Sequence, residues 1–321
     1  MKFYQFYKKY GLFVIFAILV IFFSAINPQF LTLNNFTNIL RQISMFGIVV
    51  VGYTMVMVSG GCDMSCGGQL ALCGMFAAYL AVNMGIPFWL TIILTLLLGA
   101  LFGLLNGVLM VTFNIMPLIV TLGTMLIFQG ASYLISGGKS IYGLSDSFKF
   151  IGQGSILGIP VPIILLVVVV VCGYLLLQKT YFGRELYALG GNPEAARLAG
   201  VNTKLMRIIP FVITGFLSAL SGIIMAARTG AAQPSAGTSY PFDCMTAVVL
   251  GGVSFAGGSG TIVGAMMGVV IIGVLNNGLQ LIGFDSNAIN CVKGIVLIIA
   301  IAIDSMQKKS ITKKKAYAKK T

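Results

Sequence analysis

The residues that could carry chemistry are few, and their types limit what the chain can do. The 321 residues include no histidine and only seven acidic side chains. Neither an HExxH zinc motif nor a G-x-S-x-G nucleophile turn occurs. Cys62 and Cys66 flank Asp63, but no second cysteine pair completes a zinc site, so these cysteines are expected to be inert. The sequence argues against an enzyme and predicts no catalytic, cofactor or metal site in this chain.

What remains is hydrogen bonding by polar side chains inside apolar stretches. Polar groups in hydrocarbon are costly, so their usual explanation is function or a pairing partner. We expect six of them to line a path for a polar solute: Asp63, Ser65, Gln69, Asn106, Asn276 and Asn277. Asp63 has an equal alternative role, because its oxygens could cap the following helix by accepting from amides near residues 65–67.

Two glycine-rich turns interrupt the apolar segments, GGCDMSCGG at 60–68 and GGVSFAGGSG at 251–260. Irregular backbone at membrane depth must be buried in protein or face water. These turns are therefore candidates for a path lining, as in transporters with broken helices. Alternatively, the glycines simply let helices approach closely.

One long polar stretch, residues 178–207, carries the signals of a short surface helix. Asn192 suits an N-cap and Pro193 the first helical position, while Glu194 complements the positive helix end and Gly200 suits a left-handed stop. Small residues lie between these ends. The segment is therefore predicted to dock into a groove of a partner rather than to serve as a solvated connector.

The elements that position these residues follow from composition. Hydrophobic residues make up 58% of the chain and charged residues 8%, against about 25% charged in a soluble domain. Apolar runs long enough for hydrocarbon predict ten transmembrane helices, several of them short and broken, near residues 11–27, 43–59, 69–83, 88–111, 116–136, 157–177, 208–227, 243–256, 261–282 and 287–304.

The net charge of +13 is concentrated in blocks between these runs. With ten spans the basic N-terminal arm, the 178–207 segment and the lysine-rich tail fall on one side, so both termini are predicted to be cytoplasmic. The first run is expected to be an uncleaved span rather than a signal peptide. No nucleic-acid surface is expected. We expect a permease domain at 1–306 and a basic tail at 307–321 that contacts anionic lipid headgroups.

Several motifs resemble those of the ribose-type ABC importer permeases. They are GRxxxAxGGNPEAARLAGV at 183–201, GGCDMSCGG at 60–68, AAQPSAGTSYPFD at 231–243, AVVLGGVSFAGGSGTIVGA at 247–265 and GVLNNGLQLIG at 273–283. The resemblance covers nearly the whole chain in order. It departs at 60–67, where the family commonly has GGIDLSVG; Asp63 and Ser65 are kept, and the change puts the exact sugar in doubt.

The resemblance implies a multi-pass permease subunit in the bacterial cytoplasmic membrane. Its partners would be a second permease copy or a paralogue, a cytoplasmic ATPase that carries ATP-Mg, and an extracytoplasmic sugar-binding protein. Ribose is the first expected sugar. The ATPase would contact the 183–201 segment, with these residues in the coupling role: Gly183, Arg184, Gly190, Asn192, Pro193, Glu194, Ala195, Ala196 and Gly200.

The binding protein would meet outer loops around 148–154 and 228–241, where Arg228 and Asp243 supply polarity. The competing class is an ion-coupled secondary transporter or channel for a small polar solute. Such proteins usually couple through several intramembrane ionisable groups, whereas Asp63 is nearly alone, and the capped segment would then lack a purpose.

Overall fold

The computed structural model describes the backbone of residues 2–318 and the side chains of residues 11–302. The basic tail predicted at 307–321 lies outside the described side chains. The helices are α1 (Lys2–Ile26), α2 (Leu33–Val58), α3 (Cys66–Ala78), α4 (Phe88–Phe113), α5 (Pro117–Ser136), α6 (Asp146–Gln153), α7 (Val161–Lys179), α8 (Tyr181–Gly191), α9 (Pro193–Leu198), α10 (Thr203–Thr229), α11 (Tyr240–Leu250), α12 (Ile262–Leu281) and α13 (Ser286–Ala318).

The chain is mostly helical, as expected, and its other elements are short. A 3-10 turn (Pro28–Leu31) precedes α2 and a π turn (Tyr79–Asn83) extends α3. Four two-residue strands form two antiparallel pairs, β1 (Ile141–Tyr142) with β4 (Ala231–Ala232) and β2 (Ser155–Ile156) with β3 (Ile159–Pro160).

Apolar helices occupy all ten predicted positions, but not all of them are long. Within the described residues, seven helices are long and apolar enough to cross a membrane: α2, α3 with its π turn, α4, α5, α7, α10 and α12. Shorter apolar helical stretches cover the other three positions, at Gly11–Ile26, Tyr240–Leu250 and Ser286–Ala302. Ten crossings and cytoplasmic termini stay predictions.

Two boundaries differ from the sequence prediction for identifiable reasons. Helix α2 begins at Leu33 rather than near 43, because the Thr32 side chain caps it by accepting from the Asn35 amide at 3.3 Å. Its first turns are rich in asparagine, which hides the start from a hydropathy reading. Helix α11 ends at Leu250 rather than at 256, because the chain turns at Gly252, whose φ is +82°.

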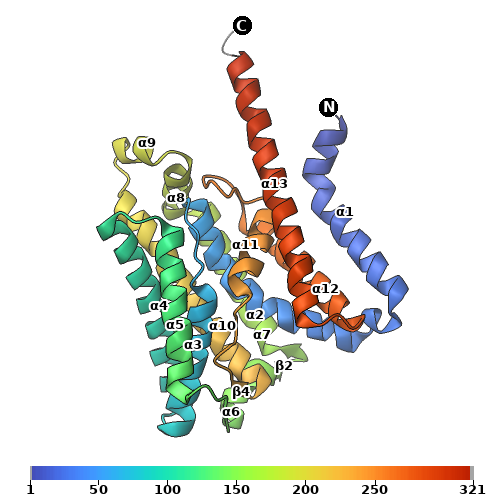
Figure 1. The fold of residues 1–321 in the computed structure, drawn as a ribbon, viewed down its shortest axis with the longest axis vertical. Coiled ribbons are helices and arrows are strands. Elements are labelled where there is room, and N and C mark those ends of the chain that lie inside the picture. The colour runs from blue at the N-terminus through green and yellow to red at the C-terminus, as the bar shows by residue number, and fades with distance from the viewer. Residues whose placement is uncertain (1, 319–321) are drawn as a thin grey trace.

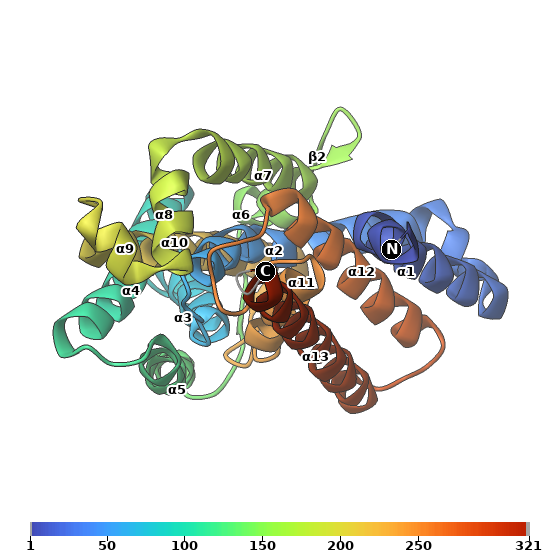
Figure 2. The same cartoon turned by 90° about the horizontal axis from the view of Figure 1, so that it is seen from above.

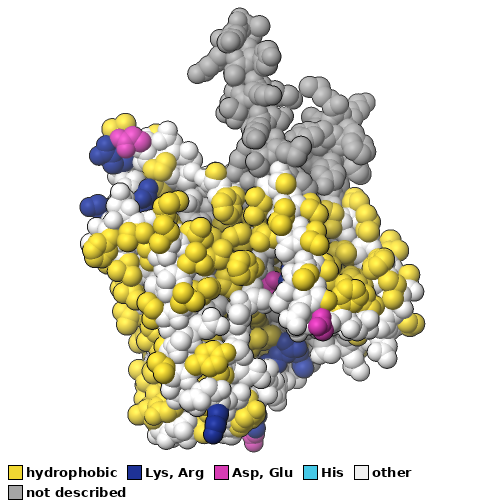
Figure 3. Space-filling model, viewed as in Figure 1, with side chains coloured by type: hydrophobic (Ala, Val, Ile, Leu, Met, Phe, Trp, Pro, Cys, Tyr) yellow, Lys and Arg dark blue, Asp and Glu magenta, His cyan; other side chains and the backbone are white. Residues whose placement is uncertain are grey.

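Helix α2 lies inside the bundle, and several others face outward. In the most apolar stretch of α2, 83% of residues are buried, against 22% in α4 and in α7. Seen from above, α2 lies in the middle with α7 to one side and α11 and α13 to the other (Figure 2). Large apolar side chains cover much of the outer surface (Figure 3), as expected of helices that face lipid.

Helices α4 and α10 pack through glycine. A Cβ atom at Gly103 would overlap the carbonyl oxygen of Phe211, and one at Gly99 would lie against the carbonyl oxygen of Gly215. Small residues allow this close approach. Inside a membrane the hydrophobic effect does not drive helices together, because lipid is as apolar as their side chains, so close packing of this kind stabilises their association.

We therefore expect Gly103→Ala to destabilise the detergent-purified protein by about 1–3 kcal/mol, because the added methyl has no free volume. The melting temperature should fall. Gly123→Ala on α5 is the matched control, because a Cβ there meets nothing within 4 Å. Equal melting temperatures for the two variants would contradict the close α4–α10 contact.

Candidate functional site

The predicted surface helix at 192–200 is present as α9, with its caps as expected. The Asn192 side chain accepts from the amides of Glu194 and Ala195, each at 3.1 Å. Pro193 occupies the first helical position, and Gly200 has a φ of +87°. Helix α9 lies at the end of the molecule where α1 begins and α13 ends (Figure 1), opposite α6 and β4.

Most of α9 is exposed and held by its own contacts. Arg197 donates to Glu194 at 2.6 Å across one turn, and both side chains are exposed. Ala195 is exposed and Leu198 is 78% exposed, whereas Ala196 is buried against the chain itself. Helix α9 is therefore largely uncovered by the rest of the described chain.

The start of α8 is fixed by close contacts, as the start of α9 is fixed by its cap. Gly183 lies so close to α7 that a Cβ there would overlap the carbonyl oxygen of Leu177. The Arg184 guanidinium stacks 4.1 Å from the centre of the exposed Tyr181 ring. Helices α7 and α8 are therefore joined tightly, and a shift of α8 would displace the end of α7.

The end of α8 meets two other segments with almost no side chain between them. We call this contact the glycine junction: Gly60 after α2, Gly190 and Gly191 at the end of α8, and Gly257 and Gly258 between α11 and α12. The Gly258 amide donates to the carbonyl oxygen of Val58 at 2.9 Å. A Cβ at Gly190 would overlap that same oxygen, and one at Gly257 would meet Gly60.

A side-chain contact strengthens the junction. The Tyr187 hydroxyl on α8 donates to the carbonyl oxygen of Gly260 at 2.6 Å. Burial raises the pKa of Tyr187 above its usual value, which favours the neutral hydroxyl that donates here. The two glycine-rich turns found in the sequence thus both contact the predicted docking segment.

Four of the six predicted path residues form one buried polar cluster: Asp63, Ser65, Gln69 and Asn106. The Ser65 hydroxyl is its hub, donating to Asp63 Oδ1 and accepting from Gln69 Nε2 at 2.7 Å and Asn106 Nδ2 at 2.8 Å. Asp63 Oδ1 also accepts from the Ser65 amide at 2.9 Å. Asp63 therefore makes the contacts of a residue that orders the start of α3.

The polar cluster is not saturated. Asp63 Oδ2, Gln69 Oε1 and Asn106 Oδ1 are buried and find no hydrogen-bond partner among the described residues. Unpaired buried acceptors cost free energy, and in proteins such groups often mark function or a bound water.

Asn276 and Asn277 lie elsewhere. Asn277 is buried and exchanges two amide hydrogen bonds with Asn35, at 2.8 and 2.9 Å, which ties α12 to α2. Asn276 lines a cavity instead. The six residues therefore belong to three places rather than to one continuous lining.

That cavity, the central cavity, has a volume of about 710 Å³. Its walls come from α2, α10, α11, α12, α13 and the 233–239 segment. Charged atoms are visible in a hollow near the middle of the face drawn in Figure 3. Lys293 and Asp243 form an ion pair in its wall at 2.9 Å.

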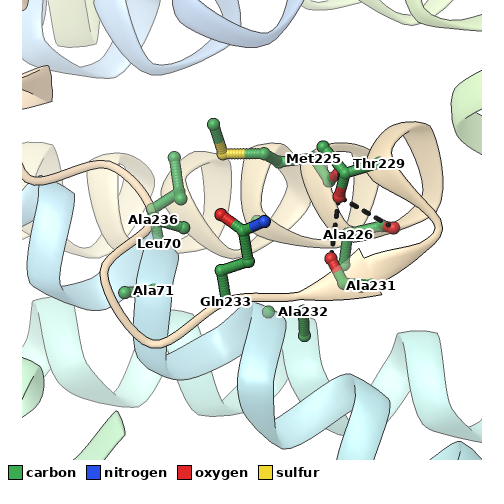
Figure 4. A pocket seen from close by; sticks show the side chains of 11 residues that line it. Leu70, Ala71, Met225, Ala226, Thr229, Ala231, Ala232, Gln233 and Ala236 are labelled. Atoms are coloured by element: carbon green, nitrogen blue, oxygen red, sulfur yellow. Dashed lines mark hydrogen bonds between the residues drawn. The ribbon is translucent and has the colours of Figure 1, made fainter. Parts of the chain in front are cut away.

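A second, much smaller pocket of about 30 Å³ lies between α3, α10 and the 231–236 segment. Gln233 reaches between small side chains there, and Thr229 donates to the carbonyl oxygen of Ala231 at 2.7 Å (Figure 4). A space of this size holds about one water, so it is too small for a solute of sugar size.

The sequence reading missed the Asp243–Lys293 pair. Lys293 is a charge inside the last apolar run at 287–304, and an intramembrane charge is by default a functional candidate with a partner to find. Arg228 and Asp243, expected in outer loops, both line the central cavity. Their burial depends on how α10, α11 and α13 pack, which no local pattern shows.

A bundle of apolar helices around a cavity with several polar side chains in its wall, and with a capped helix pair at one end, is typical of a membrane transport protein. The chain belongs to the family described as branched-chain amino acid transport system / permease component, whose model matches residues 35–301. Membership makes it a non-catalytic membrane component of a transporter.

Its relatives match over more than nine-tenths of each chain. The chain is 45% identical over 299 residues to the ribose import permease protein RbsC of Bacillus subtilis, covering 92% of each chain. It is 37% identical to the D-allose transport system permease protein AlsC of Escherichia coli, covering 94% of this chain and 93% of the relative. It is 38% identical to the L-arabinose transport system permease protein AraH of Escherichia coli, covering 95% and 92%. No solved structure matches.

The glycine junction predicts a local effect of a single methyl group. Gly190→Ala should weaken the Gly258–Val58 hydrogen bond, because the added Cβ would occupy the position of the Val58 carbonyl oxygen. We expect hydrogen–deuterium exchange at the Gly258 amide to rise about tenfold, or roughly 1.4 kcal/mol of local opening free energy. In the matched variant Gly191→Ala the Cβ meets nothing within 4 Å, so exchange should be unchanged. Unaltered exchange in both variants would contradict the junction.

The polar cluster predicts that Ser65→Ala destabilises the protein by about 1–3 kcal/mol, because Gln69 and Asn106 then lose their shared acceptor. Thermal unfolding in detergent measures this loss. The control is Ser44→Ala, since Ser44 is equally buried but donates only to the Leu40 carbonyl of its own helix. If Ser44→Ala lowered the melting temperature as much, the hub role of Ser65 would be wrong.

Proposed function

We propose that this chain is the membrane-spanning permease subunit of an ATP-driven monosaccharide importer, with ribose as its first substrate. The relatives are permeases for ribose, allose and arabinose, three monosaccharides, and the ribose permease aligns over 92% of each chain. The chain itself performs no bond chemistry in this function and binds no cofactor. ATP-Mg belongs to a separate ATPase subunit.

The observation that carries the proposal is the exposed, doubly capped helix α9 and its attachment to the bundle. A partner ATPase would hold α9, with contacts drawn from the residues around Asn192 to Gly200 and from Arg184. Closure of the ATPase on nucleotide would displace α8 and α9 together. Movement of this kind is rigid-body switching between two arrangements of packed helices.

The glycine junction gives this displacement a route into the membrane. Gly190 lies against the end of α2 and against Gly258, so a displacement of α8 toward either contact would move the turns at 60–61 and 251–260. The first turn leads into the polar cluster and α3. The second joins α11 and α12, which line the central cavity.

The remaining parts of the assembly follow from the importer class. They are a second permease copy or a paralogue, an extracytoplasmic sugar-binding protein, and the bacterial cytoplasmic membrane as location. Positive-inside charge supports cytoplasmic termini, and the beginning of α1, the end of α13 and α9 lie at one end of the molecule (Figure 1).

The six polar residues named from the sequence have three roles in this proposal. Asn276 faces the solute in the central cavity. Asn277 holds α12 to α2 through Asn35. The polar cluster around Ser65 lies at the start of α3 and changes its hydrogen bonds when the turn at 60–61 moves, which its three unpaired oxygens allow.

Replacement of Ala195 by arginine tests the coupling role. Ala195 is exposed on α9 and does not support the fold. Ala195→Arg should therefore leave the permease intact but prevent α9 from binding the ATPase. In proteoliposomes that contain permease, ATPase and binding protein, ribose-dependent stimulation of ATP hydrolysis should fall to the unstimulated rate, and ribose uptake should stop.

Met84→Arg is the control, because Met84 is 59% exposed and lies in the turn between α3 and α4. This turn is at the end of the molecule away from α9 (Figure 1). It should retain stimulation and uptake. Full stimulation of an assembled Ala195→Arg transporter would overturn the coupling role. Failure of the unaltered transporter to import ribose, allose or arabinose would overturn the monosaccharide assignment.

A further inference from the structure

The central cavity has the size and the position of a solute site. Its volume of about 710 Å³ falls within the range of roughly 300–1,000 Å³ that small-molecule sites occupy. Five helices and the 233–239 segment converge on it, so it is not a groove of one element. The small pocket beside α3 has no room for such a solute.

Uncharged polar side chains line the cavity from several directions. Gln42 comes from α2, Thr246 from α11, Asn276 and Gln280 from α12, and Asn290 from α13. Amides and hydroxyls both donate and accept hydrogen bonds. At membrane depth such groups are tolerated where they face water or a polar solute, so their convergence indicates a polar occupant.

The Asp243–Lys293 ion pair places a hydrogen-bond donor and a hydrogen-bond acceptor side by side in the cavity wall. Lys293 on α13 donates to Asp243 Oδ2 on α11 at 2.9 Å, and the two side chains are only 13% and 9% exposed. Ser239 also donates to Asp243 Oδ2, at 3.3 Å. A buried ion pair is weak evidence for stability. Here it sets an ammonium donor beside a carboxylate acceptor, which matches a hydroxyl group that must both donate and accept.

Aromatic side chains in the cavity wall match the apolar C–H face of a sugar ring. Phe46 and Tyr240 line the cavity and meet edge to face with ring centres 6.0 Å apart. Aromatic rings offer a flat apolar surface of defined geometry, which suits the C–H face of a sugar ring. Arg228 adds donors for hydroxyl oxygens, and Asp243 is already paired.

We infer that the central cavity is a transit site for a neutral monosaccharide, and that the Asp243–Lys293 pair contacts the sugar hydroxyls there. The inference rests on the proposed function and names where in this chain the sugar passes. It goes beyond the six residues chosen from the sequence, because only Asn276 among them lines this cavity.

Two variants test the site in the complete transporter reconstituted with its ATPase and binding protein. Asp243→Asn with Lys293→Gln keeps the volume and a hydrogen-bonding pair but removes both charges, so neither charge is left alone. Ribose uptake at saturating binding protein should fall at least tenfold.

Gln280→Trp fills the cavity with a larger side chain, and it tests the transit site even if the double variant does not assemble. Gln280 is exposed to the cavity, so the larger ring has room to enter it. Uptake should again fall at least tenfold. The matched control on the same helix is Val263→Trp, whose native side chain is 57% exposed on the outer surface and does not line the cavity; its uptake should equal that of the unaltered protein.

The outcomes separate the inference from the function on which it rests. If the unaltered transporter imports ribose and the assembled Gln280→Trp variant imports it equally well, the cavity is not the transit site although the function stands. If the unaltered transporter imports none of ribose, allose and arabinose, the proposed function fails first. Equal losses in Gln280→Trp and Val263→Trp would also overturn the site, because bulk anywhere on α12 would then suffice.

Discussion

The contact on which the rest of the structure depends is the meeting of three backbone segments at the glycine junction. Side chains normally separate packed segments and absorb small displacements by changing rotamer. At Gly190 there is no side chain, and the Val58 carbonyl oxygen occupies the position that a Cβ would take. The Gly258 amide donates to the same oxygen. A displacement of α8 at Gly190 is therefore passed directly to the backbone of the turns at 60–61 and 251–260.

The 60–61 turn precedes α3 and the 251–260 turn follows α11. The first turns of these two helices meet in the interior. Gly67 at the start of α3 lies so close to Gly237 that a Cβ would overlap the Gly237 carbonyl oxygen, and it also approaches Pro241 at the start of α11. Helices α3 and α11 are thus linked at their beginnings as well as through the junction. The polar cluster lies at the start of α3, and Asp243, in the first turn of α11, lines the central cavity. This connection gives the proposed coupling a physical path from the exposed α9 helix to the cavity.

Much of this organisation could be predicted from the sequence, because it follows from local chemistry. Asn192, Pro193 and Gly200 mark the ends of α9 by capping rules that need no tertiary information. Apolar runs located the helices, although the asparagine-rich start of α2 was missed. The Asp243–Lys293 pair could not be predicted in the same way. Its members are 50 residues apart, and neither carries a spacing signal, so only the packing of α11 against α13 brings them together. The division of six polar residues among three places has the same origin.

The account predicts that α9 and the 251–260 turn move as one body. Spin labels at Leu198→Cys and Phe255→Cys, with a third position at Trp89→Cys on α4 as reference, would measure this in the assembled transporter by pulsed electron paramagnetic resonance. The three native residues are exposed, and Cys172 and Cys291 would be replaced by serine because they are exposed thiols. Between the nucleotide-free and ATP-trapped states, the 198–255 distance should stay constant while the 89–198 and 89–255 distances change together. A change in the 198–255 distance with a constant 89–255 distance would contradict transmission through the glycine junction.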